Sequence, residues 1–169
     1  MLTVKSHLNK PLVSITDGKI AGEIKDLYVD RDMRQVAGVF LGREGLIKRK
    51  TMLVPRAAVH IFGVDAWLIT GSDKVVGPED VPDADTFVLV GDLRGREIVT
   101  EGGTKVGVIE DVILDPEARV LGFLLGKVHV QGPLAERKTI ARDAVSKLGS
   151  KDAPMAVVLA QAEALTVPE

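Results

Sequence analysis

Short apolar runs recur along the chain about every ten residues, and Gly, Pro, Asp and Arg fill the positions between them. Runs of this length, bounded by turn-forming residues, are typical of β-strands. Turns are expected at Thr16–Lys19, where Asp-Gly favours a hairpin, and at Arg31–Arg34. The segment Arg56–Gly63 can form one helical turn. The strands predicted in the first half are Pro11–Ile15, Glu23–Asp30, Gln35–Gly42, Thr51–Pro55 and Ala66–Thr70.

The pattern occurs twice in the chain. A shift of 85 residues, reduced to 84 after Arg34, places eleven residues between Leu8 and Gly42 on identical residues of a second copy. A solenoid would need more and shorter repeats, so two long copies favour two similar small domains. The identical pairs include Gly22 with Gly107, Asp26 with Asp111, Asp30 with Asp115, Arg34 with Arg119, and Gly38 with Gly122.

Four of the repeated glycines have an expected structural role. Gly22 and Gly107 fall where a hairpin arm begins, and Gly38 and Gly122 fall inside a predicted strand. A glycine inside a strand costs stability and usually marks a bulge or a sharp bend. Because a small barrel needs such bends to close, these glycines are expected to shape the strands rather than bind a ligand.

The expected fold class is all-β, with two tandem small barrels. The first occupies residues 1–71, and the second occupies residues 87–169 and includes a C-terminal tail. Residues 72–86 are acidic, contain prolines and are expected to form a linker. In the tail, Ala156–Leu165 begins as a strand and continues in helix-favouring residues. An edge strand left open in either barrel would favour a homo-oligomer.

Composition excludes several classes of protein. Cysteine is absent, which excludes disulfides, cysteine-ligated metals and thiol catalysis. Aromatic residues make up only 4% of the chain, so the core must consist of Val, Ile, Leu and Ala. No apolar run is long enough for a membrane helix, and the N-terminal stretch lacks a signal-peptide core, so a cytoplasmic location is expected. The net charge of −2 argues against non-specific nucleic-acid binding.

Two segments carry a family resemblance. The stretch Leu93–Gly126 (LRGREIVTEGGTKVGVIEDVILDPEARVLGFLLG) resembles the PRC-barrel signature, with a leading Leu-x-Gly, a Gly-x-x-x-Gly turn and a Val-x-Asp strand. Leu8–Gly42 is similar but looser, and Val54–Val59 resembles the family's Pro-containing segment. The resemblance implies two PRC-type β-barrels. They would be related to the cytoplasmic part of the photosynthetic reaction centre H subunit and to the C-terminal domain of the ribosome-maturation factor.

Residue types that carry chemistry are present but scattered. Asp26 and Asp111 occupy equivalent strand positions, whereas Asp30 and Asp115 stand where an Asp commonly opens a turn. The three histidines, His7, His60 and His129, do not occupy matching positions of the repeat. No serine has a nucleophile-elbow context, and no phosphate-binding loop is present. No catalytic, cofactor or metal site is therefore expected.

Two basic stretches follow the same strand of each copy. Both end in Arg-Lys-Thr, and the residues Lys48, Arg49 and Lys50 are contiguous in the first. A solvated hairpin tip explains them simply. A docking patch for an acidic partner, an anionic lipid surface or RNA is the sharper hypothesis. The candidate partner-binding residues are Lys48, Arg49, Lys50, Arg137 and Lys138.

The functional prediction follows from the resemblance, because PRC-barrels share protein–protein contact rather than catalysis. The chain is expected to be a non-enzymatic adaptor that binds another, unidentified protein. A ribosome-associated or RNA-processing factor acting in small-subunit maturation is one alternative. A small-molecule or metal-binding protein is the other, and a pocket with convergent polar groups would favour it.

Overall fold

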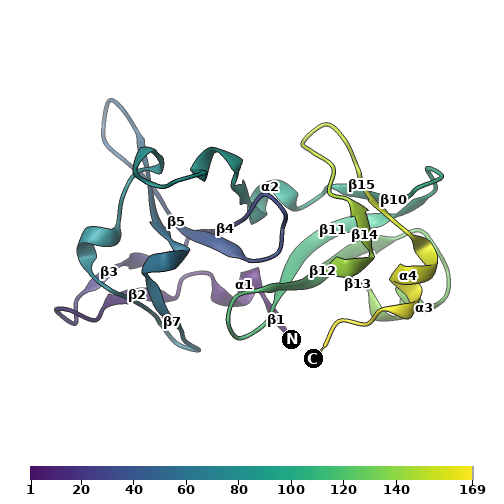
Figure 1. Cartoon of the computed structure of the whole chain (residues 1–169), viewed down its shortest axis with the longest axis horizontal. Coiled ribbons are helices and arrows are strands. Elements are labelled where there is room, and N and C mark those ends of the chain that lie inside the picture. Colours follow the sequence, from purple (N-terminus) through teal and green to yellow (C-terminus); the bar gives the residue numbers. More distant parts are fainter. Residues whose placement is uncertain (169) are drawn as a thin grey trace.

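The computed structural model describes residues 1–168, which form two β-rich halves side by side (Figure 1). Strands appear in each region of the first half where the sequence predicts them, and the helical turn predicted within Arg56–Gly63 is a short 3₁₀ helix followed by a strand. The elements of the first half are β1 (Leu2–Thr3), α1 (Val4–His7), β2 (Pro11–Ser14), β3 (Ile20–Glu23), β4 (Asp26–Val29), β5 (Val36–Glu44), β6 (Lys50–Pro55), η1 (Arg56–Ala58), β7 (Val59–Phe62) and β8 (Trp67–Ile69).

The second half repeats this order after a connection that contains three 3₁₀ helices. The predicted change from strand to helix within Ala156–Leu165 is confirmed. The remaining elements are η2 (Ser72–Lys74), η3 (Pro78–Asp80), η4 (Ala84–Thr86), β9 (Val88–Leu89), α2 (Val90–Leu93), β10 (Glu97–Thr100), β11 (Lys105–Leu114), β12 (Val120–Val128), α3 (Pro133–Arg137), β13 (Thr139–Ala141), η5 (Arg142–Ala144), β14 (Val145–Lys147), β15 (Met155–Val157) and α4 (Leu159–Ala164).

The sheets are open, so the expectation of closed barrels is wrong. In the second half the strand order is β13-β12-β11-β10-β15-β14, and β13 and β14 remain separate edges. In the first half β4 lies within the strand predicted at Glu23–Asp30, and a separate strand, β3, ends at its first residue. The chain changes its partner there, since Ile24 donates to the Lys10 carbonyl and Lys25 donates to that of Phe40. Two four-stranded sheets result, β3-β2-β8-β7 and β6-β5-β4-β9.

The two halves exchange their leading strands. β1, at the start of the first half, pairs antiparallel with β11 of the second half, with Thr3 opposite Ile113. In return β9, at the start of the second half, pairs antiparallel with β4, with Leu89 opposite Tyr28. Each half therefore contributes a strand to the sheet of the other, and the pairing has an approximate twofold symmetry.

Two equivalent carboxylates fasten the exchanged segments. Asp111 accepts the backbone N–H of Lys5 at 3.0 Å and that of Val112 at 2.8 Å. Asp26 accepts the N–H of Gly91 at 2.9 Å and that of Leu27 at 2.8 Å. Lys5 and Gly91 lie at matching positions, in the first turns of α1 and α2. The repeated aspartates are thus acceptors for amides of the opposite copy.

A second set of reciprocal contacts joins the turns between β4 and β5 and between β11 and β12. Val36 donates its N–H to the carbonyl of Ala118, and Val120 donates to that of Arg34, both at 2.9 Å. The guanidinium of Arg142 donates to the Asp32 carbonyl at 2.8 and 3.1 Å. Arg56 makes the matching reach to the Glu117 carbonyl at 2.7 Å.

One hydrophobic cluster runs through both halves. It includes Leu27 and Val29 of β4, Val112 and Leu114 of β11, and Phe123 of β12, all of them buried. Burial of this aliphatic surface is the main favourable contribution to folding. The two copies therefore share a core that is mainly aliphatic, as predicted, but that also buries Trp67 and Phe123.

The connection between the halves lies against the first half. Val76 forms an antiparallel bridge with Leu53 of β6, with both N–H···O distances 2.9 Å, and Val81 is buried. These contacts restrict a segment whose composition predicts a linker. The division into domains at residues 72–86 stays a prediction, because the exchanged strands cross it in both directions.

The repeated glycines lie where neighbouring backbones come close. A Cβ on Gly122 would lie 2.2 Å from the Ile140 carbonyl oxygen, one on Gly107 2.3 Å from that of Lys127, and one on Gly38 2.9 Å from that of Val54. A Cβ on Gly22 would meet the side chain of Leu41. The register shifts beside Gly38 and Gly122, because Ala37 and Leu121 are extra residues opposite β4 and β11.

These distances predict graded effects of alanine at three glycines. Gly122→Ala should lower the free energy of unfolding by about 2–3 kcal/mol, because its Cβ would lie 2.2 Å from a backbone oxygen. Gly38→Ala should lower it by about 1 kcal/mol, because the corresponding distance there is 2.9 Å. Gly102→Ala is the control, since only the Thr100 hydroxyl lies near its Cβ position, and its effect should stay within about 0.5 kcal/mol. Urea denaturation measures all three, and equal losses would contradict this account of the fold.

The reciprocal carboxylates predict an unequal pair of effects. Asp111→Ala should lower the free energy of unfolding by about 2–4 kcal/mol, because it leaves the amides of Lys5 and Val112 without an acceptor. Asp26→Ala should cost less, because Asp26 is only partly buried. Glu110→Ala, an exposed carboxylate on the same strand as Asp111, should be neutral. Amide hydrogen exchange at Lys5 in Asp111→Ala should rise above its wild-type rate, and unchanged protection there would argue against the exchanged contact.

Candidate functional site

A groove lies between the two halves. We call it the interdomain groove and define it by the residues that line it. Its volume is about 720 Å³. The first half contributes β4 and the turn after it, the second half contributes the loop after β14, and β9 and α2 lie between them. The lining residues are Tyr28, Arg31, Asp32, Met33, Thr86, Phe87, Val88, Leu89, Asp92, Arg96 and Leu148–Lys151.

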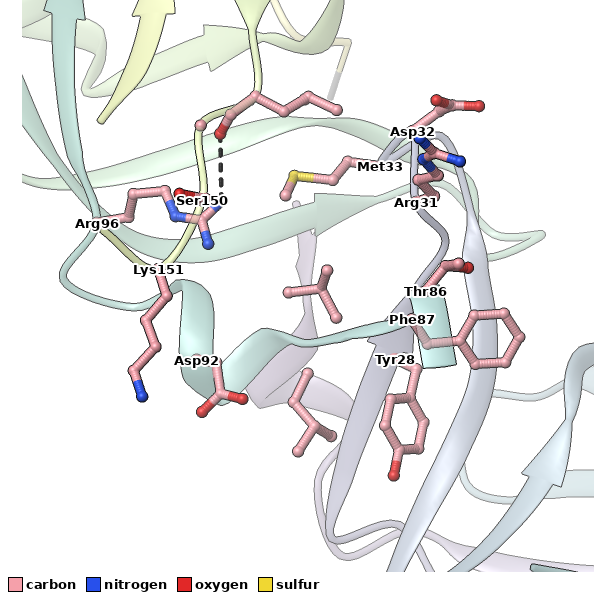
Figure 2. Close-up of a pocket in the computed structure, with 14 residues that line it drawn as sticks. Tyr28, Arg31, Asp32, Met33, Thr86, Phe87, Asp92, Arg96, Ser150 and Lys151 are labelled. Carbon is pink, nitrogen blue, oxygen red and sulfur yellow. Dashed lines mark hydrogen bonds between the residues drawn. The ribbon is translucent and has the colours of Figure 1, made fainter. Parts of the chain in front are cut away.

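The floor of the groove is apolar and its margins are charged. Figure 2 shows Met33 between Arg96 on one side and Arg31 and Asp32 on the other. The rings of Tyr28 and Phe87 lie 6.1 Å apart, centroid to centroid, at a tilted angle. A surface of this kind can hold an apolar anchor and pair a charge beside it.

The position of Arg96 is fixed by the loop on its own side of the groove. Its Nη1 donates to the carbonyl of Leu148 at 3.2 Å, drawn as the dashed line in Figure 2. Partial burial lowers the pKa of the Arg96 guanidinium, which remains charged. Lys151 and Arg31 are exposed at the margin, and the carboxylates present there are Asp32 and Asp92. The margin thus carries three cations and two anions.

Nothing in the sequence alone indicates this groove. Its lining comes from three separate stretches of the chain, residues 28–33, 86–96 and 148–151, and the exchange of β9 is what brings Phe87 beside Tyr28. The repeat establishes which residues are equivalent, but it does not show that the two copies meet along these segments.

The predicted basic residues fall into two different environments. Lys48, Arg49 and Lys50 are exposed at the tip of the hairpin formed by β5 and β6. Arg137 is partly buried, and its Nη2 donates to the carbonyls of Glu163 at 2.7 Å and Ala162 at 3.2 Å. Lys138 is exposed beside it, with φ of 57°. The structure does not bring the two stretches together, and a partner-binding role for any of the five stays a prediction.

The aspartates have structural partners. Asp30 accepts the N–H of Arg34 at 2.8 Å, and Asp115 accepts those of Glu117 and Arg119 at 2.9 and 2.8 Å, as expected of residues that open turns. Asp26 and Asp111 accept backbone amides as described above. Burial raises the pKa of Asp26 above the usual value, against the hydrogen bonds from Leu27 and Gly91 that lower it. Each of the four therefore has a place in the fold.

Within residues 1–168 no group of three or more His, Asp or Glu side chains is arranged to hold a metal ion. His7 is buried, packs edge-on against Trp67 with 5.2 Å between ring centroids, and has its Nδ1 3.0 Å from Lys10 Nζ. Because an ammonium group can only donate, Nδ1 is the acceptor and the imidazole is neutral. His60 and His129 are exposed on separate strands or loops.

No helix in the described part of the chain is both long enough and apolar enough to cross a membrane. A search of curated proteins found no significant match. The family model of the PRC-barrel domain matches residues 3–75 and 85–142, which is more than half of the chain. The chain therefore belongs to the PRC-barrel domain family, and the two matched segments confirm two tandem copies of that domain.

The environment of His7 predicts its titration. Burial, followed by the nearby charge of Lys10, lowers the pKa of His7 to about 4, against a partial rise from Asp111. The folded protein thus favours neutral His7, whereas the unfolded chain binds a proton near pH 6.5. His7 should therefore destabilise the fold as pH falls from about 6.5 toward 4.

The His7 ring resonances in NMR spectra should shift with a midpoint near pH 4. The difference in free energy of unfolding between wild type and His7→Gln should change by about 1–2 kcal/mol across the same interval, in the direction that penalises wild type at low pH. A His7 midpoint above pH 6 would show that the imidazole is not buried as described.

Proposed function

We propose that this PRC-barrel protein is a non-enzymatic adaptor that binds a segment of another protein in the interdomain groove. The observation that carries the proposal is the groove itself, since residues of both copies build it on a shared core. Its apolar floor and mixed-charge margin suit the centre and rim of a protein interface. The family supports an interaction role at this general level.

The groove favours a particular chemistry in its partner. Phe87, Leu89 and Leu148, which are partly exposed, offer apolar surface to an aliphatic or aromatic anchor. Arg31, Arg96 and Lys151 outnumber the carboxylates at the margin, so an acidic residue beside the anchor would be favoured. β9 is the terminal strand of its sheet, which allows an extended segment to lie along it.

A second candidate is binding of a small anionic molecule in the same groove. A volume of about 720 Å³ falls within the range of ligand sites, and Arg31, Arg96 and Lys151 are among its lining residues. A screen for ligands that raise the melting temperature of wild type, but not of a groove variant, distinguishes this candidate from a protein partner.

The adaptor proposal predicts loss of a partner when the charge of the groove is reversed. Affinity capture with wild type, Arg31→Glu/Lys151→Glu and the control Lys19→Glu/Lys127→Glu should yield a protein that only the groove variant fails to retain. All four side chains are exposed, so the two double variants have the same change in net charge and little effect on folding.

Binding of that protein, once purified, is then measured by titration calorimetry. The groove variant should raise its Kd at least about tenfold, and the control should leave Kd within about twofold of wild type. A Kd that is equal for wild type and groove variant would place the binding surface elsewhere. Failure of every captured protein to bind in purified form would remove the adaptor proposal.

A further inference from the structure

The tip of the hairpin between β5 and β6 exposes two large aliphatic side chains. Leu46 and Ile47 are exposed to 103% and 98% of their reference areas. We define the hairpin tip as Arg43–Lys50. It includes the last paired residues of β5 and β6, Glu44 opposite Lys50, and it projects from the body of the first half (Figure 1). Adjacent aliphatic residues with almost no protein contact are costly to leave in water.

Cations surround this apolar pair. Arg43, Lys48, Arg49 and Lys50 flank it, and Glu44 is the only carboxylate in the tip. None of the four cations forms an ion pair within residues 1–168, whose ion pairs are Lys25–Glu23, Arg34–Asp143, Arg94–Asp111 and Lys105–Glu97. The tip thus combines an exposed apolar pair with four exposed cations, unpaired within residues 1–168, that flank it in the sequence.

In the second copy the equivalent segment is covered by α4, and its residues show how such a sequence packs. There Leu134 and Arg137 precede Lys138-Thr139 as Leu46 and Arg49 precede Lys50-Thr51. Leu134 is fully buried, and Arg137 donates to carbonyls at the end of α4. No helix among residues 1–168 covers the first-copy tip, so Leu46 is left exposed where Leu134 is buried.

We propose that the hairpin tip docks on an anionic lipid surface, which goes beyond the adaptor function. The tip is convex, and its two aliphatic side chains project without a surrounding hollow, which suits shallow insertion into the interfacial region of a bilayer. The four cations would then lie at the level of anionic headgroups, where each contributes to binding. A rigid protein surface would instead need a pocket shaped to receive both side chains.

Co-sedimentation tests the proposal with vesicles of phosphatidylcholine mixed with phosphatidylglycerol, and with phosphatidylcholine alone. Wild type should bind the anionic vesicles, and more weakly as salt is raised. Lys48→Ala/Arg49→Ala/Lys50→Ala should lower the partition coefficient about a hundredfold, and Leu46→Ala/Ile47→Ala at least about tenfold. Two controls, Lys19→Ala/Lys127→Ala/Lys147→Ala and Ile20→Ala/Val64→Ala, change exposed residues elsewhere and should bind as wild type does.

The absence of native cysteine allows a direct test of insertion. A polarity-sensitive fluorophore on Leu46→Cys should shift to shorter wavelength with anionic vesicles, whereas the same label on Val64→Cys, also exposed, should not. Equal binding to both vesicle types, hairpin variants that bind like wild type, or no shift at residue 46 would each overturn the proposal. So would hairpin variants that abolish self-association, measured by sedimentation velocity, while vesicle binding is unchanged. The groove variant should still bind vesicles, which separates this test from that of the adaptor function.

Discussion

The exchange of leading strands is the constraint on which the rest of this structure depends. β1 and β9 each complete a sheet of the opposite copy, and Asp111 and Asp26 hold the turns that follow them. A two-residue strand contributes few hydrogen bonds, so it is stable only where the core beneath it is already formed. Because both copies are on one chain, each exchanged strand is presented at high effective concentration. The exchanged strands, the shared core and the groove therefore depend on one another.

The internal repeat predicted much of this architecture, and its limits are physical. Strand positions follow from local periodicity and turn chemistry, and the equivalence of Asp26 with Asp111 follows from the repeat. The repeat could not show which copy supplies each partner, since Asp111 would meet an equivalent amide in a closed barrel as well as across the interface. Closure was predicted wrongly for a related reason. Whether β13 and β14 meet depends on the summed twist and bulges of six strands, which no single segment encodes.

The candidate surfaces were predicted less completely than the fold. The exposure of Lys48–Lys50 follows from a short hairpin with several adjacent charges. The apolar pair Leu46-Ile47 in the same hairpin could also have been predicted from the sequence to be exposed. The contacts of Arg137 were not readable, because α4 reaches it from more than twenty residues away and nothing local indicates that its carbonyls will be near. The groove was beyond prediction for the same reason, as its lining residues become neighbours only through the exchange of β9.

The approximate symmetry also indicates which surfaces of the molecule could recognise a partner specifically. Contacts that obey the symmetry, such as those of Arg56 and Arg142 with the opposite turns, hold the two copies together. The groups that make these contacts are therefore not free to bind a partner. The segments before Thr51 and Thr139 break the symmetry. The second copy has a longer connection that forms α3 and is covered by α4, whereas the first copy has a short tip with Leu46 and Ile47 in solvent. Since the second copy shows that such a sequence can be buried, the exposed aliphatic pair reflects the shorter connection and the lack of a covering helix among the residues that the structure describes.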